Sequence, residues 1–422
     1  MTAGSGSAGD VAPPAVGSMD AAMPPTSMSP PSHGPLDGIR VLDLSSVIMG
    51  PLATQIFGDL GADVITVEDP KGTLSRVMTA GPVPQLSGLA LNLLRNKRSV
   101  VLDLKDPDGR RRLLDIAATV DVVVTNLRPG TLGRLRLSYD DVREVRPDIV
   151  FCQAQGYPSD SPAADAPAYD DVIQAGSGIP DAFRRQSGVP VLVPTLVADK
   201  VSGLTIAYAV LAALFERERT GRGQRVEVPM IDVMTAFTLV EHAGAATAVP
   251  PQGPPGYKRI LNPERQLQRT SDGWINVLAY TRENYEDLFQ EAGRPDLADD
   301  ERIRTARSRI ANADSLYREV AEVLVTRTTD EWLAFCADRG IPASAVPTLE
   351  DLVDALPEAD HPRAGRYKVI PQPVRFSAHR GPTVHRHAAL SGEHDDEVTA
   401  EVAAWPTRTA PAPPEQTTTE NR

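Results

Sequence analysis

The 422-residue sequence has few cysteines and no segment that marks it for export. It contains only Cys152 and Cys336, without a Cys-x-x-Cys pair or a Cys/His cluster. The sequence therefore predicts neither a disulfide framework nor a structural zinc site, and a reducing cytoplasm fits. No apolar run reaches the length of a membrane span, and residues 1–34 lack the charged start and apolar stretch of a signal peptide. We therefore expect a cytoplasmic protein with a disordered N-terminal tail.

Positive charge and several ligand motifs are also scarce. With 43 basic and 56 acidic side chains, the net charge of −13 opposes binding to nucleic acid or to an anionic membrane. An anionic ligand would need a local group of cations. The segment SSVIMGP at 45–51 carries no dinucleotide or P-loop motif, and the chain has no G-x-S-x-G elbow. The scattered histidines, including those of VHRHAALSGEH, are typical of a solvated surface, so we predict no metal site.

What the sequence does contain is a regular alternation of apolar and amphipathic segments. We predict strands at 39–44, 63–68, 99–105, 121–127 and 148–157, and helices at 107–120, 138–146 and 199–219. Strands interleaved with helices in this way indicate an α/β fold with a mostly parallel sheet covered on both faces. A proline-rich stretch at 247–265 precedes a smaller α+β domain predicted at 257–340.

Polar residues that follow the predicted strands are the first candidates for ligand binding, because open α/β sheets bind ligands beyond the carboxyl ends of their strands. Lys105 and Arg128 follow two strands, and Arg134 lies one helical stretch further on. Three cations on one rim could hold the phosphates of an anionic cofactor. Each of them alone could equally be a solvated surface cation, and Asn126 could be a turn residue.

Asp199 opens the longest apolar helix. It could simply cap this helix, but a carboxylate there also lies at the positive end of the helix dipole, which favours an ionised nucleophile. The small residues Ser202 and Gly203 would let another segment or a ligand approach closely. Asp170, which follows Tyr169 ahead of another apolar segment, is also most simply a helix cap.

A series of segments, in order between Pro35 and Val398, resembles the family III CoA-transferases, which include formyl-CoA and carnitine CoA-transferases and the 2-methylacyl-CoA racemases. These segments are PLDGIRVLDLSSVIMGP, GDLGADVITVE, NKRSVVLDLK, TNLRPGTLGRL, YDDVIQAGSG, VADKVSG, LAALFERERTGRGQRVEVPMIDV, DGWINV, GIPASAVPTLEDL and SGEHDDEV. The resemblance implies an interlocked homodimer, with a Rossmann-like large domain built from both ends of each chain and a small domain between.

The resemblance also implies the domain limits and the ligands. We expect a tail at 1–34, a large domain at 35–225 and 341–405, a linker at 226–256, the small domain at 257–340 and a second tail at 406–422. CoA or acyl-CoA would be a substrate rather than a permanently bound cofactor, and the other partner would be a small carboxylic acid.

Individual residues match the family's functional positions. Asp199 matches the catalytic aspartate, and Tyr169 stands where the racemase relatives carry a histidine. The positions that match CoA contacts are Ile48, Met49, Leu102, Lys105, Asn126, Leu127, Arg128, Arg134, Ala168 and Asp170. Since a tyrosine accepts protons poorly at neutral pH compared with a histidine, Tyr169 favours transfer over racemisation. It could instead shield or hydrogen-bond an intermediate, or simply pack.

The resemblance therefore predicts a CoA-transferase that moves CoA from an acyl-CoA to a free carboxylic acid, through aspartyl anhydride and aspartyl-CoA thioester intermediates. The alternatives are a 2-methylacyl-CoA racemase and a CoA-binding protein without catalysis. The last follows from the segment PPQGPPGYKR, which replaces the glycine-rich loop of formyl-CoA transferases. Because of this and other departures from the family pattern, the resemblance does not predict which donor and acceptor acids the protein uses.

Overall fold

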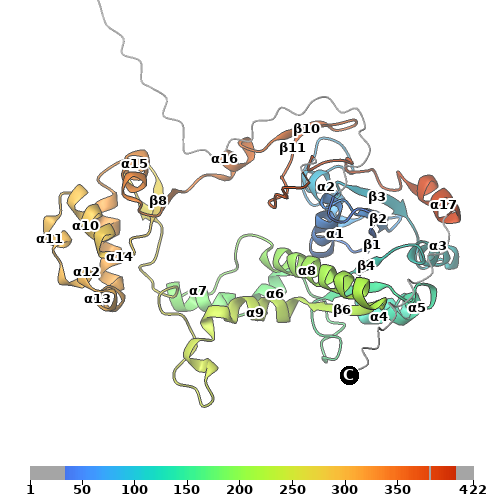
Figure 1. Cartoon of the computed structure of the whole chain (residues 1–422), viewed down its shortest axis with the longest axis horizontal. Helices are drawn as coiled ribbons and strands as arrows, with labels where there is room; N and C mark the ends of the chain where they lie inside the picture. Colours follow the sequence, from blue (N-terminus) through green and yellow to red (C-terminus); the bar gives the residue numbers. More distant parts are fainter. Residues whose placement is uncertain (1–33, 380–381, 405–422) are drawn as a thin grey trace, which may run out of the picture. The chain divides into compact units, whose positions relative to one another are not determined.

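The structure is a computed structural model that describes residues 34–379 and 382–404 (Figure 1). Both predicted tails lie outside these residues, apart from Gly34. Two compact units divide the chain. Of the described residues, 257–352 form one unit, and 34–256 form the other together with 353–379 and 382–404. The second unit is built from both ends of the chain.

A six-stranded parallel sheet organises the larger unit. Its strands are β1 (Arg40–Leu44), β2 (Asp63–Glu68), β3 (Lys97–Val101), β4 (Val122–Thr125), β5 (Val150–Gln155) and β6 (Gln224–Pro229), in the order β3-β2-β1-β4-β5-β6. Every neighbouring pair is parallel. The predicted mostly parallel sheet is confirmed, and its order is that of doubly wound folds, in which strands are added outward in one direction from β1 and in the other from β4.

Helices cover both faces of this sheet because alternate strand residues point to opposite sides. On one face, Val41, Val64 and Val124 pack with α1 (Met49–Asp59) and α8 (Val197–Thr220). On the other, Leu42, Ile65 and Val123 pack with α3 (Pro107–Ala117), α5 (Tyr139–Val145) and α17 (Asp395–Ala404). The remaining elements of this unit are α2 (Gly88–Leu93), α4 (Pro129–Leu135), α6 (Asp170–Gly176), α7 (Ile179–Ser187), α9 (Met230–His242), β10 (Glu358–His361), β11 (Gly365–Lys368) and the short 3-10 turns Leu74–Arg76 and Gly244–Thr247.

The smaller unit has its own core around the buried side chains of Trp332, Leu288 and Phe289. Its antiparallel strands are β7 (Gln268–Arg269), β8 (Trp274–Val277) and β9 (Ala343–Ala345), and its helices are α10 (Arg282–Glu291), α11 (Pro295–Ala298), α12 (Glu301–Arg304), α13 (Ala306–Ala311), α14 (Ala313–Leu324) and α15 (Thr329–Arg339). Helix α16 (Leu349–Asp354) contains the division between the units, which lies at Leu352 and not at the predicted residue 340.

Two other expectations need correction. The predicted linker at 226–256 begins inside β6, which pairs with β5 along its whole length, and continues through α9, so its first half belongs to the sheet unit. Contrary to our expectation, one described helix, α8, is long and apolar enough to cross a membrane by length and composition alone. Its residues Ile206 and Val210 are buried in the core beside the sheet, as in a core helix of a folded domain.

Candidate active site

The carboxyl ends of β1 and β4 are joined by one side chain. Asn126, just after β4, accepts a hydrogen bond from the Ser46 amide at 3.1 Å and donates one to the Ser46 carbonyl at 2.8 Å. Its amide group therefore does more than stabilise a local turn. It connects the loop after β1 with the loop after β4. Between these two strands the order in which strands are added to the sheet reverses, and such folds bind ligands there.

A buried ionic network supports the loop that leads from β1 into α1. The Asp43 carboxylate accepts hydrogen bonds from the Ser45 amide at 3.0 Å and the Thr54 hydroxyl at 2.6 Å. Lys97 Nζ lies 3.2 Å from the same carboxylate and donates to the Pro51 carbonyl at 2.8 Å. Burial lowers the pKa of Lys97, while the charge of Asp43 opposes this shift. The network ties the start of α1 to β1 and β3.

Asp199 lies in the first turn of α8 but does not cap it. The helix begins at Val197, and its N-cap residue Leu196 makes no side-chain hydrogen bond. The Asp199 side chain is 8% exposed, and its carboxylate makes no hydrogen bond or ion pair with any of the described residues. The interpretation of Asp199 as a structural cap is therefore wrong.

Helix α8 meets α1 next to Asp199. Gly203 lies one turn further along α8, and a Cβ atom there would come within 2.8 Å of the Met49 carbonyl oxygen. The close approach expected from a glycine at this position is therefore made by α1, which lies beside α8 (Figure 1). Because residues four apart share one helix face, Asp199 lies on the face of α8 that meets α1, one turn before the contact of Gly203 with Met49.

Asp170 provides the cap that Asp199 does not. The N-cap of α6 is Tyr169, and the Asp170 carboxylate instead accepts a hydrogen bond at 2.9 Å from the backbone amide of Asp199. Gln174 holds Asp170 in place by donating to its carboxylate and to the Thr195 carbonyl at 3.1 Å. The Gln174 side-chain oxygen also accepts from the Val193 amide at 2.9 Å. Helix α6 is thus tied to the segment that enters α8.

The environment of Asp199 is unfavourable to its charge. Burial, and secondly the like charge of Asp170, raise the pKa of Asp199 to about 6. These two effects oppose the helix dipole, which we expected to favour the ionised form. At neutral pH the carboxylate is still mostly ionised, yet it is poorly stabilised by its surroundings. Such a group suits a nucleophile.

Tyr169 is 66% exposed, so its side chain does not pack within the described part of its own chain. Its neighbour Ala168 is half-buried against Gly156, just beyond β5, where an added Cβ atom would lie only 2.2 Å from that of Ala168. The segment from Ala168 to Asp170 therefore lies at the carboxyl end of the sheet, with Tyr169 directed to solvent.

The three predicted cations are exposed. The Arg128 guanidinium donates to the Asp165 carbonyl at 2.8 Å, and that of Arg134 donates to the Thr131 hydroxyl at 3.0 Å. Neither these arginines nor Lys105 forms an ion pair with a carboxylate of the described chain. Lys105 follows β3 and Arg128 follows β4, so the rim extends across three strand spacings, or roughly 14 Å.

The other predicted contact positions differ in exposure. Leu127 is half-buried beside Asn126. The side chains of Ile48, Met49 and Leu102 are buried, so a ligand would meet their backbone.

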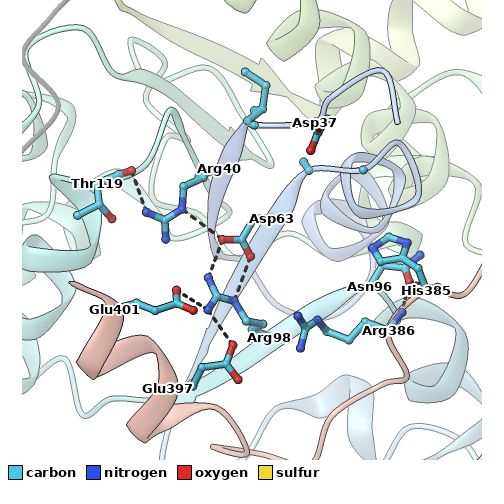
Figure 2. A pocket seen from close by; sticks show the side chains of 14 residues that line it. Asp37, Arg40, Asp63, Asn96, Arg98, Thr119, His385, Arg386, Glu397 and Glu401 are labelled. Carbon is cyan, nitrogen blue, oxygen red and sulfur yellow. Dashed lines mark hydrogen bonds and ion pairs between the residues drawn. The ribbon is translucent and has the colours of Figure 1, made fainter. Parts of the chain in front are cut away.

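A cavity of about 610 Å³ lies at the opposite end of the same sheet, where β1, β2 and β3 begin (Figure 2). Asp63 accepts hydrogen bonds there from Arg40 at 3.2 Å and Arg98 at 2.6 Å. Arg98 also pairs with Glu397 at 3.1 Å and Glu401 at 2.8 Å, both on α17. These opposite charges neutralise one another and anchor α17, and the cavity is remote from Asp199.

The comparisons with known proteins agree with this geometry. The model of CoA-transferase family III matches residues 36–395. The chain belongs to this family. It is 34% identical over 381 residues to the probable fatty acyl-CoA transferase Rv3272 of Mycobacterium tuberculosis, covering 86% of this chain and 96% of the relative. It is 30% identical over 384 residues to the succinyl-CoA:glutarate CoA-transferase of Mus musculus, covering 89% and 88%.

Solved structures of this family share the fold. A crystal structure of Rv3272 aligns with a TM-score of 0.74 at 31% identity, covering 86% of this chain and 99% of that one. A CAIB/BAIF family protein from Brucella suis aligns with a TM-score of 0.75 at 28% identity, covering 88% and 100%.

Sequence reasoning missed two groups in this family III chain. Gln174 was not singled out, although it lies one helical turn after Asp170, the spacing at which two side chains share a face. The Asp43–Lys97 pair was also missed, because a charged residue inside an apolar strand pattern is the only signal that the sequence gives.

Proposed function

We propose that this family III CoA-transferase moves CoA from an acyl-CoA thioester to a free carboxylic acid, with Asp199 as the nucleophile. The observation that carries the proposal is the buried Asp199 carboxylate, which has no partner among the described side chains and lies one helical turn before Gly203, where α8 meets the start of α1. Relatives named succinyl-CoA:glutarate and formyl-CoA:oxalate CoA-transferases support a carboxylic acid as acceptor.

The reaction needs no cofactor and no net proton transfer. The Asp199 carboxylate attacks the thioester carbonyl carbon, the C–S bond breaks, and a mixed anhydride and CoA thiolate form. The thiolate then attacks the aspartyl carbonyl, which releases the donor acid and leaves an aspartyl-CoA thioester. The acceptor carboxylate attacks this thioester, and the returning thiolate attacks the acceptor's carbonyl, giving the new acyl-CoA and free Asp199.

Backbone amides at the start of α1 would stabilise the oxyanions that develop. No side chain caps this helix, so the first-turn amides of Met49 and Gly50 have no capping oxygen. An anion at this helix end would also meet the positive end of the dipole. The burial of Asp199 would keep water from hydrolysing the intermediates.

From Asp199, CoA would extend along the carboxyl ends of the strands. Lys105, Arg128 and Arg134 are exposed and pair with no carboxylate of the described chain, so they can meet its phosphates. We assign to the exposed Tyr169 a shielding or hydrogen-bonding role over the reacting group. Its exposure and its chemistry give no support for the proton exchange of a racemase.

We also propose a homodimer. Large apolar side chains are exposed on two helices of the sheet unit, with Tyr208 at 65% and Phe215 at 67% on α8, and Phe237 at 52% and Val240 at 84% on α9. Exposed apolar groups on adjoining helices are typical of a subunit interface. Light scattering after size-exclusion chromatography would give the mass of two chains, and the mass of one chain would contradict the proposal.

The direct test is isotope exchange between an acyl-CoA and its labelled free acid, over a panel of acids. The proposal expects exchange with at least one pair and none by Asp199→Ala. Undiminished exchange by that variant would remove Asp199 from the mechanism. Deuterium incorporation at the α-carbon of a 2-methylacyl-CoA, without exchange of the acid, would establish a racemase instead.

A further inference from the structure

A second group of polar side chains lies in the smaller unit, around Arg259. One guanidinium nitrogen of Arg259 donates a hydrogen bond of 2.6 Å to the Tyr280 hydroxyl oxygen. The guanidinium carbon lies 4.6 Å from the centre of the Tyr280 ring. The Arg259 side chain is half-buried, and Tyr280 is half exposed. A cation and a phenol are thus held together at an accessible surface.

Arg259 differs from most arginines of its unit in having no carboxylate partner. Arg282, Arg302 and Arg327 each pair with an acid, whereas neither Arg259 nor Arg265 forms an ion pair within residues 257–352, all of which the structure describes. The chain carries more acidic than basic residues, so the absence of an acid beside Arg259 and Arg265 does not come from a shortage of acidic side chains. Two guanidinium groups in one region therefore lack a counter-charge.

Arg265 provides the independent observation. Its Nε atom is buried and has no hydrogen-bond partner. A small cavity of about 20 Å³ is lined by Arg265 together with Tyr285 and Tyr317. Buried polar groups are normally hydrogen-bonded, so this guanidinium nitrogen has an unused donor beside a cavity that it shares with Tyr317.

The surroundings of Arg259 keep its charge. Burial works against the charged form, but hydrogen bonding to Tyr280, Tyr317 and Tyr257 outweighs burial and raises the pKa of Arg259 above its ordinary value. The tyrosine hydroxyls can also act as donors. Because the Tyr280 oxygen already accepts a hydrogen bond from Arg259, its own hydrogen is free to point to an incoming anion.

We propose that Arg259 and Tyr280 form a binding site for the carboxylate group of a small organic acid. One guanidinium edge would bind one or both carboxylate oxygens, and the Tyr280 hydroxyl would donate to an oxygen of the same group. Arg265 adds positive charge beside Tyr317. The choice of a carboxylate rests on the proposed function, in which a free acid is a substrate, whereas the anion-binding geometry does not depend on it.

Phosphate offers the same kind of oxyanion, so the test compares two probes. Glutarate and inorganic phosphate are titrated calorimetrically into the full chain carrying Asp199→Ala, a background in which the proposed chemistry is silent. We expect glutarate to bind, and Arg259→Met to weaken its binding about tenfold or more, the effect of losing one charged hydrogen-bonding partner. Tyr280→Phe, which keeps the ring, should weaken binding severalfold.

Arg307→Met is the matched control. Arg307 is an exposed residue of α13 without an ion pair in the same unit, and its substitution removes the same charge. It should change glutarate affinity less than about twofold, because solvent and salt screen the charge of an exposed side chain. Equal weakening by Arg259→Met and Arg307→Met, or no binding of either probe to the background protein, would overturn the proposal. Phosphate binding that depends on Arg259, without glutarate binding, would establish the anion site but assign it to phosphate.

Arg259→Lys distinguishes a binding role of Arg259 from a purely structural one. It keeps the charge but loses the planar fork, so it should bind glutarate less tightly than arginine and more tightly than methionine. Glutarate should raise the melting temperature of the background protein, and this rise should shrink in Arg259→Met. Should Arg259→Met lower the melting temperature but keep the full glutarate-induced rise, the residue is structural and the proposal is wrong. Because binding is measured without catalysis, failure of the transferase proposal would leave this result unchanged.

Discussion

The charges around the cavity at the amino end of the parallel sheet are paired, whereas those of the candidate site at its carboxyl end are not. At the amino end, Arg98 meets three carboxylates, and Asp63 is shared by two guanidinium groups (Figure 2). At the carboxyl end, the Asp199 carboxylate and the cations Lys105 and Arg128 form no ion pair with the described chain. Paired charges hold elements together, while unpaired charges are available to a ligand. The difference supports our proposal that the reaction takes place at the carboxyl end, although a sizeable cavity lies at the amino end.

Replacing one aspartate at each end of the sheet should give the largest contrast in CoA exchange. Asp199→Ala should lower CoA exchange by roughly ten-thousand-fold or more, as expected when a covalent nucleophile is removed. Asp63→Ala should leave exchange within about threefold but reduce the free energy of unfolding by about 1–2 kcal/mol, because Asp63 is partly exposed and Arg98 keeps its other partners. Steady-state kinetics and urea unfolding measure both effects. A large loss of exchange in Asp63→Ala would erase the distinction between the two ends.

Breaking the buried Asp43–Lys97 ion pair should have the next largest effect, on the free energy of unfolding. Lys97→Met leaves the Asp43 carboxylate buried without its cation, which should cost about 3–5 kcal/mol in the free energy of unfolding. The exposed Lys71→Met is the matched control and should change it by less than about 0.5 kcal/mol. Equal stability of the two variants in urea unfolding would show that the Asp43–Lys97 network does not support the loop.

The raised pKa of Asp199 predicts a stability that depends on pH. Its folded value of about 6 lies above the ordinary 3.8, so the charged form is disfavoured in the folded state. The folded state is therefore least penalised below the unfolded pKa, and it loses stability as pH rises through about 6. Asp199→Asn should stabilise the protein by up to about 3 kcal/mol at pH 8 and by little at pH 4. Parallel thermal unfolding at the two pH values checks this, and an equal gain at both would be inconsistent with a titrating Asp199.

The smallest effect expected concerns the positioning of the nucleophile. Gln174→Leu removes the hydrogen bonds that connect Asp170 with the segment entering α8. We expect kcat to fall about tenfold with little change in KM, because misplacement of a reacting group mainly affects the transition state. Gln290→Leu, at an exposed position of α10, is the control. A kcat unchanged in Gln174→Leu would show that Asp170 holds Asp199 without its help.

The sequence predicted the elements of the sheet better than the contacts between them. The apolar runs around Val41, Val64 and Val123 indicate buried strands because local patterning determines which segments bury apolar side chains. Residues after strands were similarly accessible to prediction, since all parallel strands end on the same side. This is why Asn126 and Arg128 are candidates from the sequence.

The rest depends on contacts between distant residues. At the start of α8, the Asp170 carboxylate of another helix accepts a hydrogen bond from the Asp199 amide. The N-cap residue Leu196 has no capping side chain, so the local sequence does not indicate that the helix begins at Val197. The pKa of Asp199 could not be predicted from the helix dipole, because burial and the like charge of Asp170 raise it. The segment of β6 and α9 has the pattern of a strand followed by a helix, but the pattern does not show that the strand pairs with β5, so the segment was assigned to a linker instead of the sheet.

The covalent state of Asp199 during turnover tests the central claim most directly. The protein is incubated with an acyl-CoA that supports exchange, treated with hydroxylamine, digested and analysed by mass spectrometry. Our account predicts a hydroxamate on Asp199, formed from the anhydride or the thioester, in the wild-type chain and none without acyl-CoA. An unmodified Asp199 under conditions of continuing exchange, or a hydroxamate on a different carboxylate, would contradict it.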